Sequence, residues 1–145
     1  MPAKNIYHDA VVAALTTDGW TITADPLTLK YGSRDLFVDL AAERTALAAE
    51  RNGAKIAVEI QSFLNSSEVR SLQEAIGQYE LYRAVLRKVE PNRPLFLAVP
   101  RDVYDGILSE ELGQLVLTEF RIHVLVFDET THMVIQWINS ADTGT

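Results

Sequence analysis

A run of five consecutive apolar residues, from Leu95 to Val99, constrains the fold of this 145-residue chain more than any other segment. In an extended segment, successive side chains point to opposite faces of the sheet, so a continuous apolar run requires cover on both faces. Helical patterns lie before and after this run and can supply that cover. We therefore expect a central strand in an α/β domain.

Two segments have the apolar spacing of helices that bury one face. Residues 5–18 form the first, and Gly19 ends it. In the second, Asn65 is followed three residues later by Glu68, which resembles a capping box and predicts a long helix running to about Val89. A third helical segment spans Arg101 to Glu119 and is predicted to be interrupted near Gly113.

Alternation of apolar and polar residues predicts the remaining strands. They cover residues 20–31, 35–40, 55–61, 122–127 and 133–138. The first has a kink at Asp25-Pro26, and the last two form a hairpin. We interpret residues 45–52 as a strand extension or an irregular excursion. The resulting order, αβββαβ(α)ββ, predicts one α/β domain over residues 1–139 with a mixed sheet, followed by a frayed polar tail at 140–145.

The composition excludes several kinds of chemistry. Without cysteine, the chain has no disulfide, thiolate metal site or cysteine nucleophile. A net charge of −7 argues against a free-standing, non-specific nucleic-acid binder, which needs clustered cations. No apolar run approaches the ~20 residues that span a bilayer. We expect a cytoplasmic protein that does not bind membranes.

Two acidic residues are candidates for a shared site. Asp39 lies near the end of the strand predicted at 35–40, and Glu59 lies near the end of the strand at 55–61. If these strands pair, both carboxylates project into one site. With a backbone carbonyl such as that of Ile60, they would suit Mg²⁺ or Mn²⁺, and the inferred reaction is phosphodiester hydrolysis.

A solvated strand face is the alternative explanation for these acids, because the chain contains 20 aspartates and glutamates. Glu59, however, lies between Val58 and Ile60 in an otherwise apolar strand. An unpaired charge is costly there, so Glu59 needs a partner or an ion. Gln78 and Tyr82 lie one turn apart on the long helix, where they could contact this site or simply pack on the sheet.

Short segments spread over the whole chain form a specific combination: Pro2-Ala3-Lys4, Tyr7-His8-Asp9, Asp18-Gly19-Trp20, Tyr31-Gly32, Val38-Asp39-Leu40, Ala42-Glu43, Ile56-Ala57-Val58-Glu59, Ser62-Phe63, Gly77-Gln78-Tyr79, Leu81-Tyr82-Arg83, Leu97-Ala98-Val99-Pro100 and Gln136-Trp137-Ile138. In this combination the chain resembles the XisH family, the fdxN-element excision controlling factors, over residues 1 to about 139. The order of elements also resembles the PD-(D/E)XK nuclease superfamily with its QxxxY helix motif.

This resemblance implies a restriction-endonuclease-like αβββαβ core and a role in excising a DNA element, alongside a recombinase and an XisI-like partner. It also implies catalytic roles for Asp39, Glu59, Gln78 and Tyr82, and it adds Asp9 of the first helix to the acids as a metal ligand. DNA would be contacted through a local site or within a complex.

One departure from the superfamily pattern leaves the enzymatic activity open. The third motif residue is usually lysine, and Gln61 stands there. A neutral amide cannot supply the positive charge that stabilises an anionic transition state. Lys55 lies four strand residues from Glu59, a distance of about 13 Å at the rise of a strand, so it is too far to replace the lysine. Lys30 or Arg70 could reach the acids from other elements.

Three hypotheses remain. The first is a metal-dependent nuclease weakened at Gln61, and the second is an inactive accessory subunit that keeps the scaffold and binds an XisI-type protein. The third is an interaction domain without metal chemistry. We also expect a homodimer, because the long helix is apolar around most of its circumference.

Overall fold

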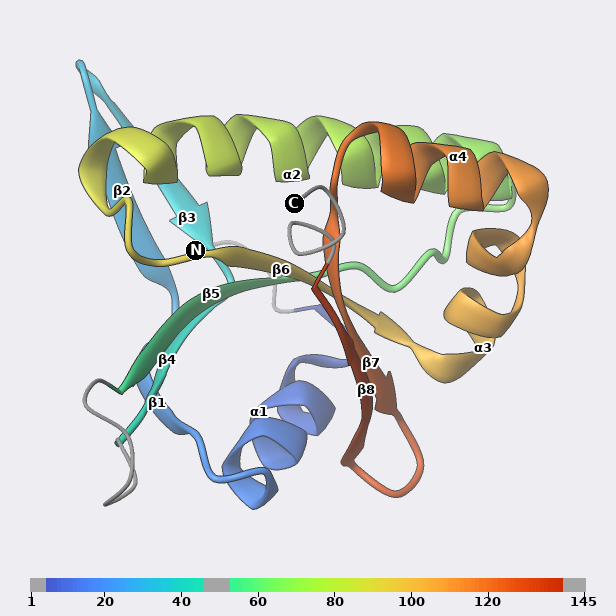
Figure 1. The fold of residues 1–145 in the computed structure, drawn as a ribbon, viewed down its shortest axis with the longest axis horizontal. Helices are drawn as coiled ribbons and strands as arrows, with labels where there is room; N and C mark the ends of the chain where they lie inside the picture. The colour runs from blue at the N-terminus through green and yellow to red at the C-terminus, as the bar shows by residue number, and fades with distance from the viewer. Residues whose placement is uncertain (1–4, 46–52, 140–145) are drawn as a thin grey trace.

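The computed structural model describes residues 5–45 and 53–139, and it shows a mixed α/β fold (Figure 1). A six-stranded sheet has the order β1-β4-β5-β6-β7-β8. Its strands are Thr21–Ala24, Leu40–Arg44, Ala54–Ile60, Leu95–Pro100, His123–Asp128 and Met133–Ile138. Two further strands, β2 (Leu27–Tyr31) and β3 (Arg34–Val38), form a separate antiparallel hairpin.

Strand β6 is central, as the apolar run predicts. It pairs in parallel with β5 on one side and with β7 on the other, and every residue of β6 is buried. The outer pairs, β1 with β4, β4 with β5 and β7 with β8, are antiparallel. Because three neighbouring strands are parallel, their carboxyl ends meet at one end of the sheet.

Helices cover both faces of this sheet. The helical elements are α1 (His8–Thr17), α2 (Glu68–Val89), α3 (Arg101–Asp105), the 3₁₀ turn η1 (Ile107–Ser109) and α4 (Glu111–Glu119). Figure 1 shows α2 and α4 along one face and α1 against the other. The sheet therefore separates two apolar clusters. One lies beneath α2, α4 and the β2–β3 hairpin, and the other surrounds α1 and Trp20.

The strand predicted at 35–40 is divided in two at Asp39. Strand β3 ends at Val38 and pairs with β2, whereas β4 begins at Leu40 and pairs with β5. The Asp39 side chain accepts a hydrogen bond from the Ile60 N–H (2.8 Å). The chain therefore leaves one sheet and enters the other at the acidic residue itself.

Helix α2 begins two residues later than the capping-box pattern predicts. Ser67 is the N-cap residue, and its hydroxyl accepts a hydrogen bond from the Arg70 N–H (3.2 Å). Asn65 instead accepts one from the Ser67 N–H (3.0 Å) and so forms the turn that precedes the helix. Both residue types compete for the cap position, and only the backbone geometry decides between them.

The interruption expected near Gly113 lies earlier, between α3 and α4. Gly113 is inside α4, where a Cβ atom would approach the Ile107 carbonyl oxygen to 2.2 Å and the Leu108 Cα to 2.5 Å. This glycine therefore serves the close packing of α4 on η1. The expectations for 45–52 and the tail at 140–145 fall largely or wholly outside the described residues.

No helix in the described parts of the chain has the length and apolar character needed to cross a membrane.

Candidate functional site

The two predicted acids lie side by side at the carboxyl end of β5. In the register of β4 and β5, Leu40 is opposite Val58, which places Asp39 next to Glu59. The Asp39 N–H donates to Glu59 Oε1 (3.3 Å), and the Ile60 N–H donates to Asp39 Oδ2 (2.8 Å). Glu59 is only 6% exposed. The pairing expected from the sequence is therefore present in the fold.

Burial makes this pair hard to ionise. Desolvation raises the pKa of Glu59 to about 9, and the neighbouring Asp39 charge adds to the effect. Desolvation also raises the pKa of Asp39, although the hydrogen bond from Ile60 opposes that rise. Within residues 5–45 and 53–139, no lysine or arginine forms an ion pair with either acid. The pair therefore holds a proton at neutral pH, with Glu59 as its main carrier.

Helix α2 brings Gln78 and Tyr82 to the same end of β5. The Gln61 amide donates a hydrogen bond to Gln78 Oε1. Burial raises the pKa of the Tyr82 hydroxyl, and the charges of Glu59 and Asp39 raise it further. The five catalytic residues predicted from the sequence thus gather at one place.

The sixth predicted residue, Asp9, lies apart from them. Its side chain is 94% exposed, and it contacts His8 Nδ1 (3.4 Å). His8 is buried, and its Nε2 pairs with Asp25 Oδ1 (2.8 Å). Asp25 in turn influences the pKa of Asp39 by its charge. The third acid near the pair is therefore Asp25, which lies between β1 and β2 and is held by His8 of α1.

Sequence reasoning missed two residues of this site, Asp25 and Asn5. The pattern around Asp25-Pro26 predicts only a kink within one strand. That prediction is wrong, because β1 and β2 belong to different sheets, and the Asp25-Pro26 peptide bond between them is cis. Asn5 donates from Nδ2 to the Ile60 carbonyl oxygen (3.2 Å) across 55 positions of sequence. No local spacing could have found that contact, because it depends on how the segment before α1 crosses the sheet.

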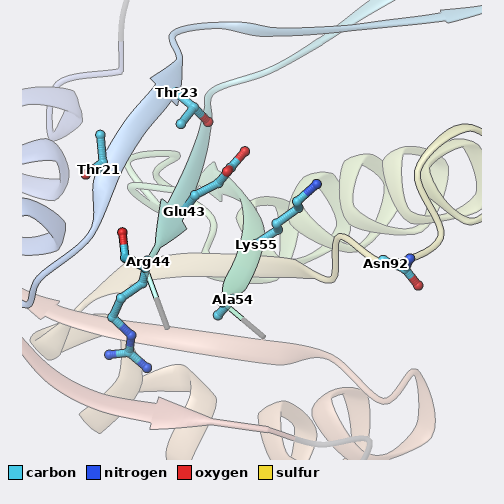
Figure 2. A pocket seen from close by; sticks show the side chains of 9 residues that line it. Thr21, Thr23, Glu43, Arg44, Ala54, Lys55 and Asn92 are labelled. Atoms are coloured by element: carbon cyan, nitrogen blue, oxygen red, sulfur yellow. The ribbon is translucent and has the colours of Figure 1, made fainter. Parts of the chain in front are cut away.

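None of the basic residues considered as a substitute for lysine is shown at the acid pair. Lys30 pairs with Asp35 on the β2–β3 hairpin (3.4 Å), and Arg70 is exposed in the first turn of α2. Lys55 is opposite Glu43, near the other end of β5. Figure 2 shows the Glu43 and Lys55 side chains pointing the same way at the rim of a hollow of about 930 Å³. This hollow lies away from the acids.

The acid pair offers an incomplete but suitable set of oxygen donors for a divalent cation. In the described part of the chain, no group of three or more histidines, aspartates and glutamates is placed to hold a metal. Two carboxylates and the Ile60 carbonyl supply hard oxygen ligands, as Mg²⁺ and Mn²⁺ prefer. A cation would also replace the proton that burial forces onto Glu59. The residues therefore fit an ion that keeps several waters.

Comparison with known proteins decides the family. The family model described as XisH protein matches residues 1–135. The chain belongs to the XisH family. No curated protein matches this XisH chain.

Two solved XisH-type structures share its fold. The crystal structure of an XisH family protein from Nostoc punctiforme PCC 73102 is 38% identical, with a TM-score of 0.84 over 93% of this chain and 100% of that one. That of an fdxN element excision controlling factor protein from Anabaena variabilis is 40% identical, with a TM-score of 0.83 over 94% and 100%.

Proposed function

We propose that this XisH protein acts in DNA excision or rearrangement by hydrolysing phosphodiester bonds at the Asp39–Glu59 pair. The Anabaena variabilis protein that it resembles is described as an fdxN element excision controlling factor, which supports a DNA-directed role. The order of elements and the two acids resemble a PD-(D/E)XK nuclease arrangement, which supports the proposal. Such a role places the protein in the cytoplasm, with DNA reaching the acids through a local surface or within a complex.

The single observation that carries this proposal is the burial of two adjacent carboxyl groups. Glu59 and Asp39 exchange hydrogen bonds with each other's backbone segments. Among the described residues, no lysine or arginine forms an ion pair with either acid, and His8 is the basic residue whose charge acts on Asp39. A purely structural role would be served at lower cost by apolar side chains or a salt bridge. A protonated acid pair at the carboxyl end of a strand therefore supports a role in binding a cation.

Asp39, Glu59 and the Ile60 carbonyl would hold Mg²⁺ or Mn²⁺. When bound, such an ion supplies a water of lowered pKa and positive charge beside a phosphate. Asn5 fixes the Ile60 carbonyl through its hydrogen bond and thereby orients that donor. The Asp9 side chain is 94% exposed and lies in α1, so we assign it no contact with the ion.

Gln61 and Gln78 would orient the attacking water through their amide groups. The hydrogen bond between these amides fixes the Gln61 side chain at the end of β5. A lysine at position 61 would add a full positive charge, which the amide lacks. Losing such a group costs on the order of 10²–10³ in rate, so we expect slow hydrolysis. Tyr82 closes the α2 side of the site.

Nicking of supercoiled plasmid DNA with Mg²⁺ or Mn²⁺ tests the proposal. We expect slow nicking by the wild type, none by Glu59→Gln and faster nicking by Gln61→Lys. Glu74→Gln is the matched control, because Glu74 is an exposed glutamate on α2. Absence of nicking by both the wild type and Gln61→Lys would contradict a hydrolytic role.

A second candidate function is a non-catalytic accessory subunit that binds an XisI-type protein. The neutral Gln61, already hydrogen-bonded to Gln78, favours this alternative. It predicts a stable complex with a purified XisI-type protein in light scattering, unchanged in Glu59→Gln. No complex would count against the accessory role.

A further inference from the structure

Four arginines gather near the amino ends of β6 and β7, at the end of the sheet opposite the acid pair. They line a hollow of about 240 Å³, together with Glu90 and His123. Arg83 and Arg87 lie on α2, and Arg93 lies in the connection between α2 and β6. Arg121 lies two residues before β7. Such a concentration of positive charge is unexpected in a chain with a net charge of −7.

Arg83 has a fixed position in this hollow. Its Nη1 donates to the Arg121 carbonyl (2.8 Å) and its Nη2 to the Phe120 carbonyl (2.7 Å), and it also pairs with Glu80. Its guanidinium lies over the Tyr79 ring, 4.8 Å from the centroid. Its buried Nε has no hydrogen-bond partner among the described residues. Arg83 thus connects α2 to the backbone that carries Arg121.

Arg93 is equally fixed, and it neutralises the acid in the wall. It is 8% exposed, and its Nε donates to Glu90 (2.7 Å). Its other two nitrogens donate to the Ile56 carbonyl (3.0 Å) and to Glu43 (3.3 Å). Glu90 is the one acid among the described residues that line the hollow. Because Arg93 engages it, Glu90 does not compensate the charges of Arg87 and Arg121.

Arg87 and Arg121 are the two cations left to bind a ligand. Both are exposed, and neither forms an ion pair within residues 5–45 and 53–139. Arg121 also adopts a left-handed backbone conformation, with φ of +50°. Non-glycine residues rarely take this conformation, and they keep it where neighbouring contacts fix it. Here the Arg83 guanidinium supplies that contact through the Arg121 carbonyl.

We propose that this hollow binds a phosphate group, with Arg87 and Arg121 as its direct ligands. Guanidinium groups present paired N–H donors that match phosphate oxygens, and an anion would compensate the charges of Arg87 and Arg121, which no acid pairs with among the described residues. The volume is below the range of about 300–1,000 Å³ that is usual for drug-sized ligands. The hollow therefore suits a single phosphate group, on a nucleic acid or on a small molecule, rather than a whole cofactor.

Calorimetric titration with inorganic phosphate tests this site independently of metal binding and DNA cleavage. We expect saturable binding by the wild type and at least about tenfold weaker binding by Arg87→Gln and by Arg121→Gln, since each loses a charge-assisted hydrogen bond. Arg70→Gln is the matched control, because Arg70 is an exposed arginine in the first turn of the same helix. Thermal unfolding of each variant checks that it folds.

A second titration with short duplex DNA identifies the source of the phosphate. Equal weakening of DNA binding in Arg87→Gln and Arg121→Gln would support the site and assign it to a nucleic-acid backbone. Loss of phosphate binding with no change in DNA binding would support the site and assign it to a free phosphate compound. The proposal is overturned if the wild type shows no saturable phosphate binding, or if both variants bind phosphate as Arg70→Gln does.

Discussion

At the scale of single residues, the most unusual feature is the protonation of Glu59, whose pKa is raised to about 9. Its carboxyl group is buried beside Asp39, and desolvation is the main cause of its raised pKa. In the unfolded chain the same group ionises near its ordinary value. The folded protein therefore binds one more proton than the unfolded chain between those two pKa values.

The first prediction is a pH-dependent stability that belongs to Glu59. Its pKa rises from 4.5 to about 9 on folding, so its contribution to stability falls as pH rises through that window. The slope approaches about 1.4 kcal/mol per pH unit for one proton. Chemical denaturation of the wild type and Glu59→Gln at several pH values measures it. We expect the variant to be the more stable at pH 8, with a smaller difference at pH 5.

Equal pH profiles for the two proteins would contradict this account of Glu59. Glu74→Gln serves as the control, because Glu74 is exposed on α2 and should leave the profile of the wild type unchanged.

The second prediction concerns Tyr79, which joins two strands through one hydroxyl. This buried hydroxyl donates to the Leu95 carbonyl (2.8 Å) and accepts from the His123 N–H (3.0 Å). Tyr79→Phe would leave both backbone groups without this partner and should cost about 1–3 kcal/mol of unfolding free energy. Urea denaturation measures the loss. Tyr31→Phe, at a half-exposed tyrosine, should change stability little, and an equal loss in both variants would argue against this role.

At the scale of elements, two helical glycines have opposite roles. Gly113 packs against the backbone of η1, where a Cβ would lie 2.2 Å from the Ile107 carbonyl oxygen. Gly77, in α2, has nothing within 4 Å of the position a Cβ would take. The same substitution should therefore have opposite signs at the two sites.

The third prediction follows from this contrast. Gly113→Ala should destabilise the protein by about 1–3 kcal/mol or more, because α4 must move away from η1. Gly77→Ala should stabilise it by roughly 0.5–1 kcal/mol, since alanine favours the helix and meets no atom. Thermal unfolding of the two variants compares them directly. Destabilisation by Gly77→Ala to the same extent would show that α2 packs differently.

The type of an element can be predicted from the sequence where the hydrophobic pattern is long. The prediction is wrong where a single long-range contact determines the backbone path. The apolar run of β6 and the spacing in α2 predict a central strand and a long helix, and both are confirmed. The division of a predicted strand at Asp39 was not predictable, because it depends on a hydrogen bond to Ile60 across 21 positions. The approach of Asp39 to Glu59 was expected from strand pairing, and that of Gln78 from the family resemblance. Asp25 and Asn5 carry no local signal of that kind.

At the scale of the whole molecule, apolar side chains remain exposed on the helices of one face. Leu81 of α2 is 52% exposed, and Leu112 and Leu115 of α4 are 44% and 59% exposed. Figure 1 shows these two helices along the same face of the sheet. Exposed apolar surface of this kind is typical of contacts between subunits.

The fourth prediction is that the protein is a homodimer through this helical face. We expect a dimeric mass by light scattering, and a shift toward the monomer in Leu81→Asp and Leu115→Asp. Phe37→Asp is a control, because Phe37 is also exposed but lies on the β2–β3 hairpin. A monomeric mass across a concentration series would contradict the prediction.

The measurement that tests the central claim most directly is calorimetric titration of the wild type with Mn²⁺. If Asp39 and Glu59 hold a divalent ion, one ion should bind per chain at millimolar or lower concentration, with proton release that reflects the raised pKa of Glu59. Binding should disappear in Glu59→Gln and persist in Glu74→Gln. Failure of the wild type to bind Mn²⁺ saturably, or unchanged binding by Glu59→Gln, would contradict the assignment of this buried acid pair as a metal site.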